Sequence, residues 1–321
     1  MRQLCTIALT LAIALASTIA AAAGNGTPIN AGSANATTIA VIGDAPYGPA
    51  QLEELPTLVD AIDRDPKVRL VAHLGDIKSG STRCDDAYYA TIAASFASFK
   101  DPLVYTPGDN EWTDCHRANN GGYDPLERLA FLRQTFFSSP GVSLGGRKQQ
   151  VLSQPGYPEN QLWMESKVVF AALHVVGSGN GYAPWTGNTT PTPAQRAEVA
   201  ARIAATVAWI DEAFATATRQ GALGVVLLMQ ADTFFGANEV ADGFDEVVAA
   251  IGADAAAFGR PVLLLQGDTH EYTVDNPYAT APNLTRIVVE GETVSEWLRL
   301  TIDPRASQLF AWQRMTVGGG Q

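Results

Sequence analysis

The sequence predicts a single α/β domain with mixed β-sheets, and three observations support this. From residue 37 onward, short apolar runs rich in β-branched residues alternate with longer segments of helical character. Several of the apolar runs end in a turn that carries an Asp, at the point where a buried strand of an α/β sheet would reach its carboxyl end. Near the end of the chain, three β-rich runs follow one another closely, which indicates antiparallel pairing.

The first half of the domain gives three strands, each followed by a helix. The expected strands lie near 37–43, 68–74 and 102–106, and the expected helices near 50–64, 85–99 and 125–137. A long loop separates the third strand from its helix. Residues 140–160 are rich in Gly, Pro, Ser and Gln, so we expect them to cross the surface as an irregular excursion.

The second half begins with a hairpin, because the β-rich stretches Gln161–Glu165 and Lys167–Val176 are joined too closely for a helical crossover. A helix is expected over 193–218, where a capping residue and a Pro precede apolar residues at intervals of three and four. The remaining elements are a strand at 223–229, a helix at 241–257, and strands at 261–265, 285–289, 294–301 and 307–313. No internal linker indicates a second domain, so the domain extends over 37–316.

The ends of the chain have a different composition from the domain. Residues 1–23 combine a charged start, a short apolar stretch and an Ala-rich end, which is typical of a secretory signal peptide rather than a spanning helix. We expect cleavage near Ala23, a flexible linker over 24–36 and a flexible tail over 317–321. No later segment reaches spanning length without charge or Pro, so we expect a protein without a membrane span, secreted or periplasmic.

The composition limits the possible partners. Hydrophobic residues make up 46% of the 321 residues, which is enough for a real core. With 21 basic and 33 acidic residues, the net charge is -12, and loss of Arg2 with the leader makes it -13 (20 minus 33). Nucleic acid and anionic membranes are disfavoured as partners, because binding them requires arrays of Lys and Arg. The sequence gives no indication of the oligomeric state.

Two cysteines remain after the leader, which removes Cys5. In an oxidising compartment, Cys84 and Cys115 form an even pair, and we expect them to make a disulfide. The bridge would contribute roughly 3 to 4 kcal/mol by closing its loop. It would also connect the turn after the second strand with the turn after the third. Free buried thiols or a transition-metal pair are the alternatives.

The Asp-bearing turns predict a site. Asp44, Asp76, Asp109 and Asp268 each come directly after an apolar run, and groups past the carboxyl ends of such strands gather in one crevice. Carboxylates that lie close together in a weak dielectric cannot all stay ionised, so either their pKa values rise or a cation binds among them. The sequence therefore predicts a metal site at the strand ends.

The order of these motifs resembles the calcineurin-like metallophosphoesterases. An Asp follows the first strand, Gly-Asp the second, Gly-Asp-Asn-Glu (108–111) the third, and Gly-Asp-Thr-His (267–270) comes near the end. The resemblance extends over about 37–316. It implies a layered sandwich of two mixed β-sheets flanked by helices, with two metal ions at the strand ends and a metal-bound hydroxide that attacks a phosphate ester.

The resemblance also implies roles for individual residues. The implied metal ligands are Asp44, Asp76, Asp109, Gln230, Asp268 and His270. Asn110 stands at the position of the catalytic His, and Glu111 matches the acid that closes the same motif. The chain departs from the family pattern at Pro46 and Gln230, each in place of a His ligand, at Asp109 in place of Asn, and at Asp268 in place of His.

These departures change the expected chemistry. Every substitute except Pro46 offers an oxygen, so the set favours Mg²⁺, Mn²⁺ or Ca²⁺ over Zn²⁺, and one ion is easier to accommodate than two. Asn110 can donate a hydrogen bond to a phosphoryl oxygen but cannot supply a proton to a leaving group. Glu111 could serve as the acid if its pKa is raised, and His270 is expected to be functional.

The same residues have structural interpretations. A Gly-Asp turn is a common choice at the start of a helix, so Asp44, Asp76 or Asp268 taken singly could be structural, and only their common position favours a site. Asp232 is a weak site candidate, and His73 and His174 are expected to be core or supporting residues. His116, beside Cys115, could either reach the site or face solvent. The loop aromatics Tyr47, Trp112 and Trp185 are expected to pack rather than bind.

Two functions remain from different classes. The first is a secreted metal-dependent phosphoesterase that hydrolyses a phosphate mono- or diester, of small-molecule or polymeric type, with a metal-activated water. The second is a catalytically silent relative that keeps the fold as a binding module for a metal, a glycan or a protein partner. Motifs of serine hydrolases, P-loop enzymes and dinucleotide enzymes do not occur in the sequence.

Overall fold

The computed structural model of the protein describes residues 35–235, 239–240 and 243–318. The expected leader, most of the expected linker and the last three residues of the expected tail lie outside the described residues. Within the described part of the chain, every helix is too short or too polar to cross a membrane.

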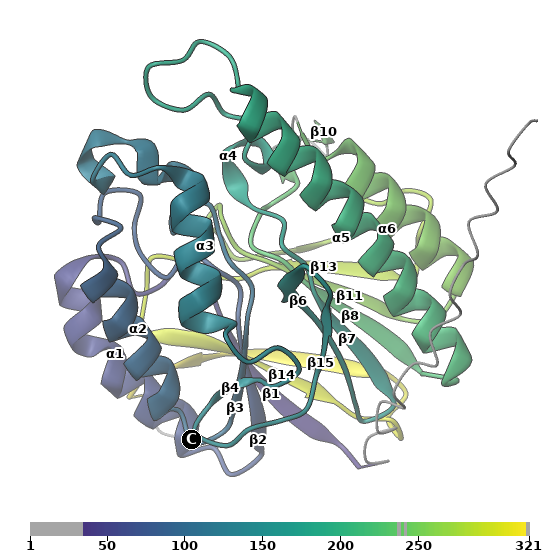
Figure 1. The fold of residues 1–321 in the computed structure, drawn as a ribbon. Coiled ribbons are helices and arrows are strands. Elements are labelled where there is room, and N and C mark those ends of the chain that lie inside the picture. The colour runs from purple at the N-terminus through teal and green to yellow at the C-terminus, as the bar shows by residue number, and fades with distance from the viewer. Residues whose placement is uncertain (1–34, 236–238, 241–242, 319–321) are drawn as a thin grey trace, which may run out of the picture.

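Two mixed β-sheets lie face to face at the centre of the molecule (Figure 1). The first sheet contains β1 (Thr37–Ile42), β2 (Val68–His73), β3 (Pro102–Tyr105), β4 (Leu144–Gly145), β14 (Glu296–Ile302) and β15 (Phe310–Thr316). Its strand order is β15-β14-β1-β2-β3-β4, in which β1, β2 and β3 are parallel and the outer strands pair antiparallel. The carboxyl ends of the three parallel strands therefore share one edge.

The second sheet has the same mixed character. It contains β5 (Leu152–Gln154), β6 (Tyr157–Glu165), β7 (Val168–Ala172), β8 (Gly224–Leu228), β11 (Val262–Gln266), β12 (Thr273–Asp275) and β13 (Leu284–Val288). In the order β12-β13-β11-β8-β7-β6-β5, the four strands from β13 to β7 are parallel. A separate two-stranded pair is formed by β9 (Phe234–Phe235) and β10 (Glu239–Val240).

Helices cover the outer faces of both sheets (Figure 1). On the first sheet lie α1 (Gly48–Asp63), α2 (Asp86–Ser98) and α3 (Pro125–Phe136), and on the second lie α5 (Pro193–Arg219) and α6 (Asp245–Phe258). Short helical turns are η1 (Thr113–His116), η2 (Ala118–Asn120) and α4 (Gly177–Asn180). Helix α5 begins with a complete capping box, in which the Thr192 side chain accepts from Gln195 N–H and Gln195 Oε1 accepts from Thr192 N–H.

Three apolar layers result from the alternation of side chains along the strands. On β1, Ala40 and Ile42 pack against the helices of the first sheet, whereas Ile39 and Val41 pack between the two sheets. On β11, Leu264 packs toward α5 and α6, and Leu263 packs between the sheets. The layers are therefore helix, sheet, sheet and helix, which confirms the predicted fold class.

The expected elements differ from the structure in a few places. The stretch 140–160 is not an irregular excursion, because β4, β5 and the start of β6 lie within it. Its low β-propensity hides the edge strands β4 and β5, which form by pairing with β3 and β6. The helix expected from 241 begins at Asp245, and β12 was not expected.

Candidate metal centre

Five turns from both sheets bring the predicted site residues to one edge of the molecule. Asp44 follows β1, Asp76 follows β2 and Asp109 follows β3, whereas Gln230 follows β8 and Asp268 follows β11. The two sheets are joined at this edge, since Asp268 N–H donates to the Asp44 carboxylate at 3.0 and 3.2 Å. Thus the topology places the carboxyl ends of parallel strands from both sheets together, as the sequence predicted.

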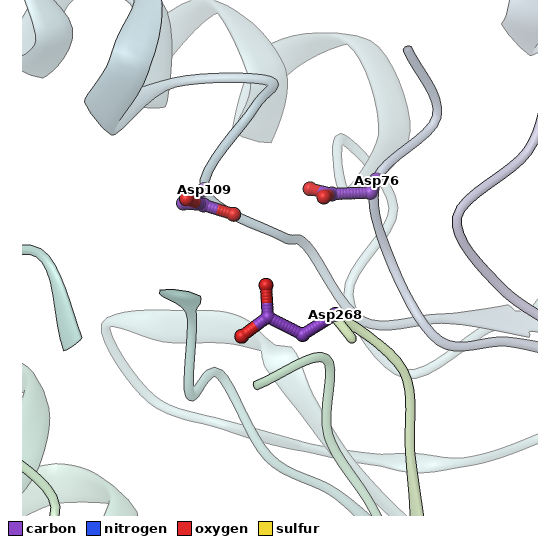
Figure 2. A group of neighbouring side chains, drawn as sticks. All are labelled: Asp76, Asp109 and Asp268. Carbon is purple, nitrogen blue, oxygen red and sulfur yellow. The ribbon is translucent and has the colours of Figure 1, made fainter. Parts of the chain in front are cut away.

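Three of the carboxylates point toward one another, each from a different loop (Figure 2). One carboxylate oxygen from each of Asp76, Asp109 and Asp268 lies within 4.8 Å of the other two. We call these three residues the acidic centre. Among the described residues, this is the group of His, Cys, Asp and Glu side chains close enough together to hold a metal ion.

The turns that carry these side chains have unusual backbone conformations. Asp44, Asp76, Asp268 and His270 have φ values of 50°, 53°, 78° and 60°. This left-handed region is strained for residues other than Gly, although Asp tolerates it better than most, and such strain gathers at functional sites. Beside Asp76, a Cβ on Gly108 would lie 2.1 Å from Asp76 Oδ1, so only Gly permits this close approach.

Burial makes the acidic centre electrostatically costly. Asp76 is 2% exposed and Asp109 7% exposed. Burial, with the nearby Asp109 carboxylate as the next cause, raises the pKa values of Asp76 and Asp268 well above their ordinary range. No Lys or Arg of the described chain makes an ion pair with any of the three. A cation bound among them would remove this cost.

Gln230 faces the acidic centre with its nitrogen. Its Nε2 lies 3.3 Å from Asp76, 3.3 Å from Asp109 and 3.1 Å from Asp268. Its Oε1 accepts the N–H of Gly177 at 2.7 Å, which fixes the orientation of the amide. Gln230 therefore offers hydrogen atoms rather than the oxygen that the sequence suggested. These contacts are longer than the 2.7–2.9 Å or so of a strong charge-assisted hydrogen bond, so they leave the three charges only weakly compensated.

Asn110 is held directly against Asp76. Its Nδ2 donates to Asp76 Oδ2 at 2.6 Å, and its backbone N–H donates to Asp76 Oδ1 at 3.1 Å. The hydroxyl of Tyr47 lies 3.0 Å from the same Asp76 Oδ2. The amide of Asn110 thus lines the open side of the acidic centre, where the resemblance placed it.

Glu111 lies beneath the acidic centre. It is fully buried, and its Oε1 accepts from Tyr105 O–H at 2.6 Å, Gly108 N–H at 2.7 Å and Asp76 N–H at 3.1 Å. Burial raises its pKa. These contacts organise the turns after β2 and β3, and Glu111 is not among the residues that line the pocket described below.

Asp44 and His270 lie beside the acidic centre. Asp44 is fully buried, and His270 Nε2 lies 3.6 Å from its Oδ1. Through this contact Asp44 raises the pKa of His270. All six predicted ligands are therefore at one location, with three carboxylates converging and Asp44 and His270 paired next to them.

An open pocket of about 420 Å³ leads to the acidic centre. The acidic centre lines it, together with Tyr47, Ser79, Gly80, Ser81, Asn110, Asp114, Arg117, His270 and Glu292. Arg117 and His270 are the groups that can carry positive charge in this lining. A polar anionic ligand therefore has access to the three carboxylates only in company with a bound cation.

Several residues of the site were not identified from the sequence. Fully buried Lys78 donates from Nζ to Asn110 O at 2.7 Å, and burial lowers its pKa to about 8. Ser178 Oγ lies 2.8 Å from Asp109 Oδ2 and 2.9 Å from Asp114 Oδ1, and Arg117 pairs with Asp114 at 2.7 Å. Lys78 lies two residues after Asp76, which was an available signal, whereas nothing in the sequence marks Ser178.

The structure contains the disulfide Cys84–Cys115, with the two Cα atoms 5.9 Å apart. It connects the turns after β2 and β3 beneath the site, as expected. Both sulfur atoms lie 3.7 Å from Asn110 O, so the bridge supports the turn that carries Asn110.

The remaining candidates have structural contacts. His73 donates to Ala45 O at 2.8 Å, and burial lowers its pKa to about 4. His174 pairs with Glu159, Asp232 with Arg286, and His116 Nδ1 lies 2.8 Å from Thr186 Oγ1. Trp112 is buried, and Trp185 Nε1–H donates to Thr113. The expectation for His73 and His174 therefore agrees with their surroundings, and Tyr47 contacts the site rather than only packing.

The donor set fits a divalent metal ion. Three carboxylate groups, two buried and one half-buried, have no protein cation beside them among the described residues and match the oxygen ligands that Mg²⁺, Mn²⁺ and Ca²⁺ prefer.

The chain was compared with known proteins. A model of the family "calcineurin-like phosphoesterase" matches residues 37–203. No curated protein matches the sequence. The solved structure of the purple acid phosphatase PPD1 from yellow lupin (Lupinus luteus) seeds is similar over 89% of this chain, with a TM-score of 0.54 and 10% identity.

The match to the lupin phosphatase covers 52% of that protein, so this chain spans about half its length, and the likeness concerns the fold alone. GAP50, the anchor in the inner membrane complex of Plasmodium, has a TM-score of 0.48 and 7% identity, with 89% of this chain and 90% of that chain covered. The family model covers more than half of the chain and includes the turns of Asp44, Asp76 and Asp109. The chain belongs to the calcineurin-like phosphoesterase family.

Proposed function

We propose that the protein is an exported, metal-dependent phosphoesterase that hydrolyses a phosphate mono- or diester. The observation that carries this proposal is the acidic centre. Three converging carboxylates, two buried and one half-buried, have no protein cation beside them and lie at the base of an open pocket in a phosphoesterase fold, which is an arrangement suited to a divalent ion. The ion is Mg²⁺, Mn²⁺ or Ca²⁺ rather than Zn²⁺, because the ligands are oxygens.

Asp76, Asp109 and Asp268 would hold the ion, which supplies an activated water and neutralises charge on the phosphoryl oxygens. Asn110, fixed against Asp76, lines the same pocket, and its amide would donate to the phosphate by exchanging its hydrogen bond with the Tyr47 hydroxyl. Arg117, oriented by Asp114, offers N–H groups to a second phosphoryl oxygen. Glu111 positions the turns from beneath, rather than contacting the substrate.

One observation favours the catalytically silent binding module as an alternative. Gln230 already donates toward all three carboxylates, which reduces their need for a cation. Asn110 also cannot donate a proton to a leaving group, so the hydrolysis of an ester with a poor leaving group would be accelerated little.

The decisive experiment measures metal content and turnover together. Protein purified without chelator is analysed by elemental mass spectrometry and assayed on p-nitrophenyl phosphate and bis(p-nitrophenyl) phosphate with Mg²⁺, Mn²⁺ or Ca²⁺. Asp76→Asn is expected to lose the ion and to lower kcat/KM by about 10³-fold or more, since a metal contributes several kcal/mol to the transition state. Asp254→Asn, on helix α6 away from the pocket, is the matched control.

Each outcome decides between the two functions. A folded Asp76→Asn protein with full activity would contradict the phosphoesterase proposal. Bound metal without turnover on either ester would favour the binding module.

Export is a separate part of the proposal, supported by the leader-like residues 1–23 and by the disulfide. N-terminal sequencing of protein recovered from the periplasm or medium tests it. A start near Gly24 is expected, and an intact Met1 on the recovered protein would contradict cleavage.

A further inference from the structure

We propose that the centre holds one divalent ion rather than two, because the hydroxyl of Tyr47 occupies the position that a second ion would need. This inference rests on the metal centre of the proposed function and concerns its composition. It differs from the two-ion arrangement that the family resemblance implied.

The predicted ligands divide into two sets around Asp76. Asp76, Asp109 and Asp268 converge and form the first ion position. Gln230 faces this first position with its amide nitrogen. The predicted ligands left for a second position are therefore Asp44 and His270, with Asp76 as the shared residue. Asp44 and His270 lie beside each other, with 3.6 Å between Asp44 Oδ1 and His270 Nε2.

Tyr47 reaches into this second set with its hydroxyl. The hydroxyl oxygen lies 3.0 Å from Asp76 Oδ2 and 3.3 Å from His270 Nε2, and it accepts from Asn110 Nδ2 at 3.1 Å. An ion bound by Asp76 and His270 would have to lie about 2.0–2.6 Å from the ligand atoms of both residues. The hydroxyl is within hydrogen-bond distance of both of these atoms, so an ion bound to them would have to compete with it for the same ligand atoms.

The position of Tyr47 is fixed from several sides. Its backbone N–H donates to Gln51 Oε1 at 2.8 Å, immediately before helix α1. Its ring meets the His270 ring edge-on, with 5.3 Å between centroids and 83° between planes. A second ion would therefore have to displace a side chain that is held by its backbone, its ring and its hydroxyl.

The hydrogen bonds of Asp44 give it a structural role. Both of its oxygens accept the N–H of Asp268, and the side chain is packed so closely that a Cβ on Gly267 would lie 2.3 Å from its Oδ2. Asp44 thus acts as a positioning residue that aims the Asp268 turn at the acidic centre.

The charges also differ between the two positions. The first position gathers three carboxylates, whereas at the second the carboxylate of Asp44 is faced by the His270 imidazole, which the neutral Tyr47 hydroxyl contacts. The need for a cation is concentrated at the first position. A phosphate in the pocket would meet one ion on that side and the neutral donors Tyr47 and Asn110 on the other, since both line the pocket.

The test counts ions and examines whether they are coupled. Full-length protein is equilibrated with Mn²⁺ alone, freed of excess metal, and analysed by elemental mass spectrometry and electron paramagnetic resonance. We expect one Mn²⁺ per chain and the spectrum of an isolated ion. Tyr47→Phe removes only the hydroxyl and is expected to raise the content toward two, and Tyr47→Ala, which also removes the ring, should raise it at least as far.

Further variants separate the roles of the ligands. Asp109→Asn should lose the ion, whereas Asp44→Asn keeps an oxygen for the Asp268 N–H and should retain the ion with affinity reduced less than tenfold. Tyr272→Ala, a half-buried tyrosine outside the set, is the matched control and should leave the count at one.

The outcomes distinguish this inference from the proposed function. Two ions per wild-type chain, or a spin-coupled spectrum, would overturn it, as would a Tyr47→Ala protein that still binds one ion with unchanged affinity. One isolated ion without ester hydrolysis would support it while contradicting the proposed function. No ion in the wild type would overturn both.

Discussion

Two groups of buried charged residues in this protein have opposite properties. In the acidic centre, burial raises the pKa values of Asp76 and Asp268. In a second group, which we call the closed network, Glu159 accepts from Arg133 Nη2 at 2.5 Å and from His174 Nδ1 at 2.8 Å. Burial alone would raise the pKa of Glu159, but the hydrogen bonds and charges of these two partners lower it to about 2.

The comparison shows that burial does not identify a functional carboxylate. Glu159 is fully buried and Asp76 nearly so, yet only Glu159 has a protein cation within hydrogen-bond distance. A charge that the fold itself neutralises is a structural element. A charge that the fold leaves without a counter-ion, at the base of a pocket, is available to a ligand.

The first prediction concerns unfolding without metal and has the largest expected effect on stability. Glu159→Gln leaves the half-buried Arg133 without its charge partner and should lower the free energy of unfolding by roughly 3 to 5 kcal/mol. Asp76→Asn removes a repelling carboxylate and should leave that free energy unchanged or raise it. Urea denaturation in chelator measures both, and an equal loss for the two variants would remove the distinction.

The second prediction concerns how the acidic centre is held in place, which is by a covalent bridge rather than by ion pairs. Replacing Cys84 and Cys115 by Ser opens a loop with a sequence separation of 31 and should cost roughly 3 to 4 kcal/mol. Because the sulfur atoms contact Asn110 O, metal affinity should fall as well. Denaturation and Mn²⁺ titration measure the two effects, and unchanged metal affinity would show that the turns hold their positions without the bridge.

The third prediction uses pH to separate the two groups. The folded-state pKa of Asp76 is raised, so its proton adds stability that is fully present below the unfolded pKa and is lost as pH rises through the folded value. In chelator, the wild type should therefore lose more stability than Asp76→Asn as the pH rises from 5 to 8. Saturating Mg²⁺ should abolish the difference.

Glu159 should behave in the opposite sense. Its folded-state pKa is depressed to about 2, so its contribution is present above the ordinary value of about 4.5 and disappears as the pH falls toward 2. Thermal unfolding across pH 2–8 covers both windows. A wild type whose metal-free stability is flat relative to Asp76→Asn from pH 5 to 8 would contradict the assignment of the proton to the acidic centre.

The sequence was sufficient for features that depend on periodicity and on strand ends. Apolar runs followed by Asp predicted that Asp76, Asp109 and Asp268 lie at one edge, and the strand order brings them together there. The disulfide followed from the even pair of cysteines. The edge strands β4 and β5 could not be found in this way, because their pairing partners rather than their own residues determine them.

Side-chain orientation was also beyond the sequence. The nitrogen of Gln230 faces the acidic centre because Gly177, distant in the chain, takes its oxygen. Tyr47 contacts Asp76 and His270 only after two sheets have brought three turns together. Such contacts depend on the packed fold, so motif position alone predicted which residues meet but not which atoms they present.

The last prediction has the smallest expected effect. It tests whether a pair of neighbouring carboxyl groups with a raised pKa is enough to bind a metal ion. Asp254 on α6 lies against Asp211 on α5, and partial burial, followed by the Asp211 carboxylate, raises its pKa to about 6. The protonated form adds stability below about pH 4, which is lost as the pH rises through 6, so Asp254→Asn should stabilise the protein at pH 8 and not at pH 4. Solvent screening at this partly exposed pair limits the gain to a few tenths of a kcal/mol. Metal content should not change, because two carboxylates between helices lack the third ligand that the strand ends supply. A loss of metal in this variant would mean that carboxyl groups with raised pKa values bind ions wherever they occur.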